Sequence, residues 1–324
     1  MDSEFRKDIV SGDWVLIAGA RGRRPHAVES HEKNSQAISE CPFEEGWDQA
    51  GPPTGQAGAI QVIKNKFPAV TPGLCAPIAE REGYQIAQGV GYHELILFRD
   101  HDKFFPDFSD DEMAGVVRAY RDRYRQIAAE DDCAQYIMIF HNHGREAGAS
   151  VFHPHSQIIS LPILPPDVTR SLRGSAEYHR THGREAHELM IAHELTEGTR
   201  IVYENEKFVA FCPFVSKQPY EVRIYPRDAS AYFDRIADSD VKYFGDAVRG
   251  VLRKFKTALA DPAYNFFIHT APLKSDLPSG HYEACYRWHM ELYPRIKLDA
   301  GFEAGTGIKI NMIDPDFAAE TLNE

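Results

Sequence analysis

The second half of this 324-residue chain repeats the order of motifs found in the first half, and this repeat constrains the fold more than any other feature. The segment EKFVAFCPF (206–214) echoes NKFPAVTPG (65–73), and YNFFIHTAP (264–272) echoes QYIMIFHNH (135–143). Each copy has the pattern strand, strand, helix, strand, strand. We therefore expect an α+β protein of two duplicated units, a mostly antiparallel sheet with crossing helices. The boundary is expected between residues 1–165 and 166–324, and such halves would pack side by side, for example in one continuous sheet.

The clearest single element is a helix over residues 109–130. Ser109 is expected to be its N-cap, and Glu112 completes a capping box. Its apolar residues recur at helical spacing: Met113, Val116, Val117, Tyr120, Tyr124 and Ile127. Apolar runs predict strands at 14–18, 60–70, 92–99 and 135–140.

The stretch 142–161, NHGREAGASVFHPHSQIISL, carries the strongest chemical signal in the chain. His153 and His155 are spaced i, i+2, so on an extended backbone both side chains point the same way. Pro154 between them lacks a backbone donor, and we expect the motif to form the lip of a pocket rather than part of a central strand. Paired histidines serve metal ligation or nucleophilic and acid–base catalysis, and a polar loop without a special role is the alternative.

The residues around the histidines favour phosphoryl chemistry. A neutral imidazole can attack phosphorus and split one transfer into two easier steps. Gln157 and the turn Gly148-Ala149-Ser150 offer donors that would stabilise the developing phosphoryl charge. Three arginines at 21, 23 and 24 suit phosphate binding, although a solvated basic loop explains them equally well.

Composition excludes several functional classes. The net charge of −12 argues against a nucleic acid polymer as partner, because binding to a phosphate backbone needs a basic face. No apolar run is long enough to span a membrane and no secretory signal is visible, so a cytoplasmic location is expected. The five cysteines are odd in number and widely spread, which indicates mostly buried thiols rather than disulfides.

With these motifs in this order, the chain resembles the galactose-1-phosphate uridylyltransferase family, the nucleotidyl-transferring branch of the histidine-triad superfamily. The resemblance covers nearly the whole chain. It rests on ARGRRP, CPF, NKFPAV, RDH, GASxxHPHSQ, HTAP, WHxELYPR and FEAGTG.

The resemblance implies a ping-pong reaction in which His155 attacks the α-phosphorus of a nucleotide sugar and a sugar 1-phosphate later accepts the nucleotide. Gln157 and Ser150 would bind phosphoryl oxygens, and Asn142 would orient the nucleophile or its phosphate. The resemblance also implies substrate-binding residues and a homodimer, in which the arginines reach the partner's substrate phosphates. These residues are Arg21, Arg24, Asn65, Lys66, Gly148 and Glu303, the last contacting hexose hydroxyls.

Two metal sites follow from the same resemblance. A structural zinc would be held by Cys41, Glu44, His101 and His153, with Glu44 where relatives often have a second cysteine. A metal-free, hydrogen-bonded cluster is the alternative. A second metal such as iron would use His269, His289 and Glu291, with ordinary core and surface histidines as the alternative.

Three functions remain open at this point. The first is uridylyl exchange between UDP-glucose and galactose 1-phosphate. The second keeps the same His155 chemistry in an ADP-glucose phosphorylase-like transfer of adenylyl to phosphate. The third is a non-catalytic nucleotide-binding protein, although binding alone needs no nucleophile. Histidines outside these sets, including His93, His141 and His143, are interpreted as ordinary surface or loop residues.

Overall fold

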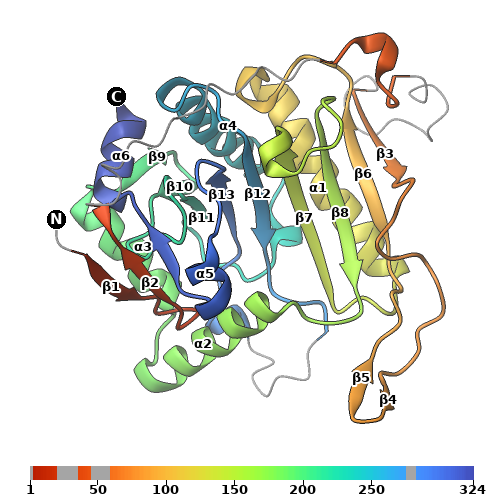
Figure 1. The fold of residues 1–324 in the computed structure, drawn as a ribbon, viewed down its shortest axis with the longest axis horizontal. Helices are drawn as coiled ribbons and strands as arrows, with labels where there is room; N and C mark the ends of the chain where they lie inside the picture. The colour runs from red at the N-terminus through yellow and green to blue at the C-terminus, as the bar shows by residue number, and fades with distance from the viewer. Residues whose placement is uncertain (1–2, 20–35, 45–58, 275–281) are drawn as a thin grey trace.

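Among the described residues, nine strands form one antiparallel sheet that runs through both halves of the computed structural model (Figure 1). The structure describes residues 3–19, 36–44, 59–274 and 282–324. The sheet order is β3 (Ile60–Lys64), β6 (His93–Phe98), β8 (His155–Leu161), β7 (Tyr136–His143), β12 (Tyr264–His269), β13 (His289–Pro294), β11 (Val222–Pro226), β10 (Phe208–Phe211) and β9 (Ile201–Glu204). The predicted α+β class and antiparallel sheet are confirmed. The halves meet where β7 pairs with β12, and the boundary after residue 165 stays a prediction.

Two long helices cover one face of this sheet, which we call face A. They are α1 (Asp110–Glu130) in the first half and α4 (Val241–Ala258) in the second, and they pack against each other. The predicted capping box is present, because the Ser109 side chain accepts from the Glu112 amide while the Glu112 carboxylate accepts from the Ser109 amide. The apolar stripe of α1 lies in the main core. The helix expected over 109–130 is therefore confirmed.

The opposite face, face B, is covered differently in the two halves. Over the second half lie α2 (Pro166–His182), α3 (Ala186–Glu197), α5 (Gly301–Thr306) and a sheet of β1 (Glu4–Lys7), β2 (Trp14–Ile17) and β14 (Lys309–Asn311) (Figure 1). Helix α6 (Pro315–Asn323) follows β14, and the hairpin β4 (Ala79–Arg81) and β5 (Tyr84–Ile86) projects from the first half (Figure 1). Within the described part of the chain, Figure 1 shows no helix over face B of β6 and β8.

Two strand predictions need correction. The strand expected over 60–70 ends at Lys64, because the Asn65 side chain turns the chain by accepting from the Phe67 amide at 2.9 Å. The histidine motif does enter a central strand, since β8 begins at His155. Pro154 lies just outside it, so its missing N–H removes no ladder bond, and its carbonyl oxygen still accepts from the Phe98 amide at 3.3 Å.

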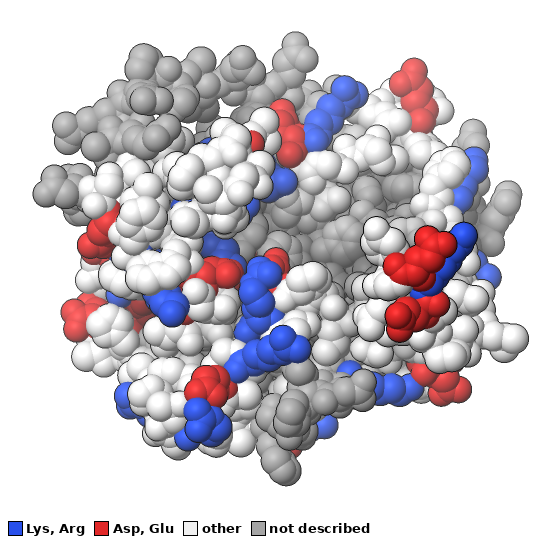
Figure 2. All heavy atoms as spheres, turned by 60° about the horizontal axis from the view of Figure 1, so that its bottom comes forward, with Lys and Arg blue, Asp and Glu red and all other residues white. Residues whose placement is uncertain are grey.

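The described cysteines form no disulfide, and all of them are buried except Cys75, which is exposed. No helix among the described residues is long and apolar enough to cross a bilayer, and the cytoplasmic location stays a prediction. On the face shown in Figure 2, acidic and basic side chains are interspersed in small groups.

Helix α2 approaches the β1–β2 connection closely at Gly174, and this contact generates a prediction. A Cβ at Gly174 would lie 1.7 Å from the carbonyl oxygen of Val10, a backbone atom that cannot move aside cheaply. We expect Gly174→Ala to lower the free energy of unfolding by about 1–3 kcal/mol because the contact is overpacked. Thermal and urea unfolding measure the change.

Gly115 in α1 is the matched control. A Cβ there would meet only Ile60 Cδ1 at 3.7 Å, an ordinary contact. Alanine has the higher helix propensity, so Gly115→Ala is expected to be neutral or stabilising by up to about 1 kcal/mol. Equal effects of the two substitutions would contradict the close approach of α2 to Val10.

Candidate functional site

His155, the predicted nucleophile, lies at the start of β8 with its side chain on face B. The next residue, Ser156, points to face A, where its hydroxyl bonds Tyr120 of α1, and alternation places His155 and Gln157 on the other side. His155 Nδ1 lies 2.8 Å from the carbonyl oxygen of His153. A carbonyl can only accept, so Nδ1 carries the proton and Nε2 keeps its lone pair. Burial lowers the pKa of His155, which favours this neutral ring.

The predicted zinc ligands come together beside His155. His153 Nδ1 lies 3.6 Å from Cys41 Sγ, 3.3 Å from His101 Nδ1 and 3.3 Å from Glu44 Oε1. The same Glu44 oxygen is 3.6 Å from His101 Nδ1. Cys41, His101 and His153 are buried and form a group able to hold a metal ion. These residues come from the 36–44 segment, the turn after β6 and the residues before β8.

The outer nitrogens of both histidines in this cluster are occupied by backbone carbonyls. His153 Nε2 lies 2.6 Å from the Phe98 oxygen, and His101 Nε2 lies 2.9 Å from the Gln36 oxygen. Each ring therefore turns an Nδ1 lone pair toward Cys41 and Glu44. Histidines that bind zinc are commonly oriented in this way, by a carbonyl oxygen that accepts from the other ring nitrogen. Burial and then Glu44 raise the pKa of the Cys41 thiol, so a cation in the centre is needed to hold the thiolate. The donor set fits zinc.

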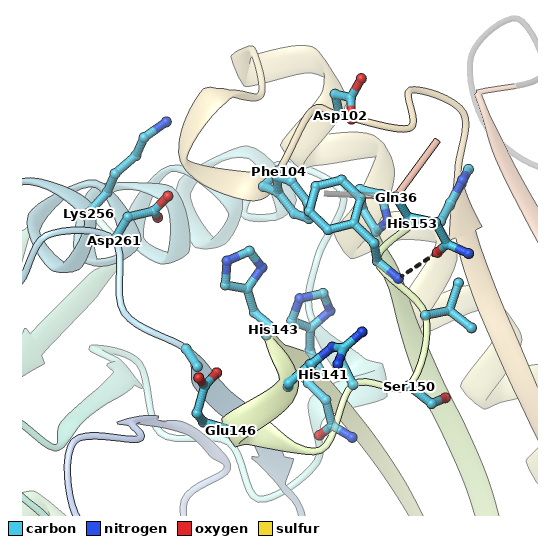
Figure 3. A pocket seen from close by; sticks show the side chains of 18 of the residues that line it. Gln36, Asp102, Phe104, His141, His143, Glu146, Ser150, His153, Lys256 and Asp261 are labelled. Atoms are coloured by element: carbon cyan, nitrogen blue, oxygen red, sulfur yellow. Dashed lines mark hydrogen bonds between the residues drawn. The ribbon is translucent and has the colours of Figure 1, made fainter. Parts of the chain in front are cut away.

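The turn before the histidine motif forms one wall of a pocket of about 590 Å³. Figure 3 shows His141 and His143 pointing into it below Phe104, with Lys256 and Asp261 at one side and Gln36 at another. Asn142, Ser150 and His153 line this pocket. His155 and Gln157 are not among its lining residues. Because His141 pairs with Ser156 in the register of β7 and β8, alternation places Asn142 on face B with His155 and Gln157.

Asn142 is held by Asn265 of the neighbouring strand β12. Asn265 Nδ2 donates to Asn142 Oδ1 and to the Ala147 carbonyl oxygen, both at 2.8 Å. The Asn142 amide nitrogen is thereby turned toward Gly148, where a Cβ would lie 3.9 Å from it. Gly148 has φ +87°, a left-handed conformation that glycine adopts without strain. Asn265 has no counterpart in the sequence prediction.

The His93 ring lies between the Gln157 and Asn65 side chains, in contrast to its interpretation as an ordinary surface or loop residue. His93 Nε2 lies 2.9 Å from Gln157 Oε1 and 3.2 Å from Asn65 Nδ2. His93 begins β6, and the same alternation that predicted this strand places it on face B with Leu95. That alternation is the signal that could have found it. Lys66, next to Asn65, is exposed.

His141 and His143 also differ from their interpretation as surface residues. His141 is 2% exposed, stacks on Phe266 and bonds Ser156 Oγ at 3.0 Å. Burial lowers the pKa of His141 well below its usual value. The His143 ring packs against Phe104 and Tyr264, with each pair of ring centroids 4.7 Å apart. His141 is therefore a core residue beneath face A.

Glu303 lies apart from the other predicted substrate residues. It belongs to α5, over the second half of the sheet, while β8 is in the first half (Figure 1). Its carboxylate bonds Lys297 and the Ala300 amide, and the Lys297 bond is the main cause that lowers the pKa of Glu303 to about 2. Arg21 and Arg24 lie outside the described residues.

The predicted second metal set comes together on face B of β12 and β13. His269 and His289 are paired across the two strands, and Glu291 lies 3.6 Å from His269 Nε2 and 3.5 Å from His289 Nε2. The three residues form a group able to hold a metal ion and border a pocket of about 320 Å³. Arg223, however, lies 3.1 Å from Glu291. Burial opposes ionisation of Glu291, but Arg223 and His269 outweigh it and the pKa falls well below its usual value.

His187 of α3 is a further member of this region that the sequence did not single out as a ligand. It is fully buried, and its ring centroid lies 5.6 Å from that of His289. Within the described part of the chain neither ring nitrogen makes a hydrogen bond, although Nδ1 lies 3.7 Å from Glu185 Oε1. Arg287 donates to both carboxylate oxygens of Glu185 at 3.1 and 2.9 Å.

The chain is similar to known proteins over nearly its whole length. The family model for the N-terminal domain of galactose-1-phosphate uridyl transferase matches residues 1–165, and a domain of unknown function, DUF4921, matches residues 91–323. ADP-glucose phosphorylase of Arabidopsis thaliana is 31% identical over 99% of this chain and 92% of its own length. Galactose-1-phosphate uridylyltransferase of Thermotoga maritima is 27% identical over 99% and 98%.

Solved structures similar to this chain include an ADP-glucose phosphorylase and a uridylyltransferase. A crystal structure of an Arabidopsis thaliana ADP-glucose phosphorylase with bound ADP-glucose has a TM-score of 0.82 and 28% identity, covering 100% of this chain and 99% of that one. A uridylyltransferase structure has a TM-score of 0.76 and 27% identity, covering 99% and 97%. The similarity extends over both halves of the sheet.

The buried, neutral histidines predict a loss of stability in acid. The pKa of His141 is well below 6.5 in the folded protein and about 6.5 in the unfolded chain, so below pH 6.5 the unfolded chain binds an extra proton. Stability is therefore expected to fall as the pH drops below about 6.5. His141→Phe keeps the ring stack, and it should lose about 1 kcal/mol less than the wild type between pH 7.5 and 5.5. Urea unfolding at the two pH values measures this, and equal losses would contradict it.

Proposed function

The chain belongs to the galactose-1-phosphate uridylyltransferase family, and from this membership we propose that it transfers a nucleotidyl group through His155. The family assignment makes it a nucleotidyltransferase. The observation that carries the specific proposal is the hydrogen bond from His155 Nδ1 to the His153 carbonyl oxygen, because it leaves Nε2 as a free nucleophile. The substrates are a nucleotide sugar and a phosphate-bearing acceptor.

In the proposed first step, the Nε2 lone pair of His155 attacks the α-phosphorus of the nucleotide sugar. A P–N bond forms, the P–O bond to the β-phosphate breaks, and the sugar 1-phosphate leaves with the bonding electrons. The new imidazolium keeps its proton on Nδ1 and donates it to the His153 carbonyl oxygen in a hydrogen bond, which stabilises the positive charge. In the second step a phosphate oxygen of the acceptor attacks the same phosphorus and forms a new P–O bond. The P–N bond breaks, its electron pair returns to Nε2, and His155 is neutral again.

The phosphoryl oxygens would be bound by donors from the surrounding turn. Gln157 lies on the same face of β8 as His155, and Asn142 turns its amide nitrogen toward Gly148. Ser150 follows in the same turn and is exposed, so it can meet a phosphate. The nucleoside end of the donor would be contacted by Asn65, which lies beside the His93 ring, and by Lys66, which is exposed. These donors act where charge develops on the transferred phosphoryl group.

Two donor and acceptor pairs remain candidates. Adenylyl transfer from ADP-glucose to phosphate is supported by the relative at 31% identity and the structure at TM-score 0.82. Uridylyl exchange between UDP-glucose and galactose 1-phosphate, the first expectation from the sequence, is supported by relatives at 27% identity. We place ADP-glucose first because both comparisons favour it.

Transfer of a radiolabelled nucleotide to the chain tests this proposal. With the label in the α-phosphate, ADP-glucose is expected to leave acid-labile, base-stable label on the wild-type protein, as a phosphoramidate would. His155→Ala should take up none, because it lacks the nucleophile, while His182→Ala, at an exposed position on α2, should label normally. Inorganic phosphate should then discharge the label as ADP.

The alternatives give distinct outcomes in the same experiment. Label from UDP-glucose alone, discharged by galactose 1-phosphate, would identify the uridylyl exchange. If neither nucleotide sugar labels the wild-type chain, the transferase proposal is wrong and a non-catalytic nucleotide-binding protein takes its place.

We propose zinc as the resident ion of the cluster Cys41, Glu44, His101 and His153, where its contribution would be structural, holding the loop before β8. The second cluster fits a metal less well, because Arg223 already balances the charge of Glu291. Iron at His269, His289 and Glu291 is therefore left as an outcome of elemental analysis.

Protein purified without added metal is expected to contain close to one zinc per chain. Cys41→Ser should lower this content strongly, because a hydroxyl replaces the thiolate ligand. Cys75→Ser, at an exposed cysteine outside the cluster, should leave it unchanged. A zinc content near zero in the wild type would favour a metal-free, hydrogen-bonded cluster.

We also propose that the chain acts as a homodimer. Within one chain Glu303 lies over the second half of the sheet, away from β8, so its predicted contact with the sugar at His155 requires a second chain.

A further inference from the structure

His93 determines which end of the Gln157 amide faces His155. Three groups surround its ring on face B: the backbone amide of Ala69, the Asn65 side chain and the Gln157 side chain. His93 also accepts at its own carbonyl oxygen from the Asn65 amide at 3.1 Å, so the 65–69 segment is tied to the start of β6. The ring therefore connects this segment with β8.

The backbone amide of Ala69 decides the tautomer of His93. Ala69 N lies 3.0 Å from His93 Nδ1, and an amide N–H can only donate, so Nδ1 carries no proton. The proton of the neutral ring is then on Nε2, which needs an acceptor. Two side chains lie within reach of Nε2, those of Gln157 and Asn65.

Only the Gln157 oxygen can accept the Nε2 proton. Asn65 Oδ1 already accepts from the Phe67 amide at 2.9 Å, which turns the Asn65 NH₂ group toward His93 at 3.2 Å. An NH₂ group cannot accept a proton from Nε2. The acceptor is thus Gln157 Oε1 at 2.9 Å. With the oxygen held there, both N–H groups of the Gln157 amide are directed away from His93.

We propose that His93 is a positioning residue that orients the Gln157 amide, so that its NH₂ group rather than its oxygen meets the transferred phosphoryl group. This inference rests on the proposed nucleotidyl transfer through His155. A glutamine amide can rotate by half a turn, and the rotated form would set a carbonyl oxygen against the phosphoryl oxygens. The hydrogen bond from His93 disfavours that rotamer and pre-organises a donor for the developing charge.

Single-turnover labelling of His155 in chains that carry a substitution at His93 tests this role, with the donor that labels the wild type. His93→Phe keeps a ring but removes the hydrogen bonds to the Ala69 amide and to Gln157 Oε1. We expect the first step to slow by about tenfold to a hundredfold, because the Gln157 NH₂ group is then misplaced. His93→Gln retains a donor near the Nε2 position and is expected to recover most of the rate. His182→Phe, on the exposed surface of α2, is the matched control and should keep the wild-type rate.

A double-mutant cycle separates positioning from a general structural defect. If His93 acts through Gln157, then His93→Phe should cost little in a Gln157→Ala background, because there is no amide left to orient. Equal losses in both backgrounds, or a wild-type rate for His93→Phe, would overturn the inference. Thermal unfolding of each variant establishes that it is folded at the assay temperature.

Nitrogen chemical shifts of His93 give a readout that does not depend on catalysis. We expect the neutral ring to carry its proton on Nε2, and a proton on Nδ1 would overturn the inference even if the chain transfers nucleotides as proposed. Failure of the wild type to label with either nucleotide sugar would instead reject the proposed function, and with it the role of Gln157 toward a phosphoryl group.

Discussion

The hydrogen bond between the His155 ring and the His153 carbonyl oxygen is the interaction on which the candidate site depends. It determines which ring nitrogen is available for chemistry, and it works only if the carbonyl is held in place. The His153 ring donates to the Phe98 carbonyl and faces Cys41, His101 and Glu44 with its other nitrogen. The cluster beside β8 and the proposed nucleophile are thus parts of one assembly, because a single peptide unit connects them.

The second copy shows the same backbone arrangement with different surroundings. His289 Nδ1 lies 3.0 Å from the Arg287 carbonyl oxygen, which parallels the bond between His155 and His153. Arg287, however, pairs with Glu185 instead of entering a metal cluster. Face B of this half is covered by α2, α3 and the small sheet, and His289 is buried among aromatic rings. The two copies therefore share the backbone arrangement around the histidine. In the second copy α2, α3 and the small sheet cover face B, whereas no helix of the described chain covers face B of β8.

Local patterns were sufficient for those features whose cause is local. The helix over 109–130 could be predicted because its capping box and apolar spacing act within a few residues. The histidine motif was evident for the same reason. The expectation that Pro154 would keep the motif out of a central strand was wrong, since a proline directly before a strand removes no ladder bond. The sequence does not reveal the surroundings of His93 and His141, because the pattern around a histidine in a strand is the same whether its ring meets water, a core ring or another side chain.

The amino-acid sequence alone was enough to predict the duplicated pattern, the order of strands and helices, and the residues of each motif. Periodicity, capping and turn chemistry depend only on residues that are close together in the chain. The tautomers of His93, His153 and His155, and the separation of Glu303 from β8, were decided only by the tertiary structure. Their partners are distant in the chain: Cys41 and His153 are 112 residues apart, and His93 and Gln157 are 64 apart. Such contacts exist only after the strands pair, since strand pairing brings a carbonyl oxygen or an amide within reach of each ring nitrogen.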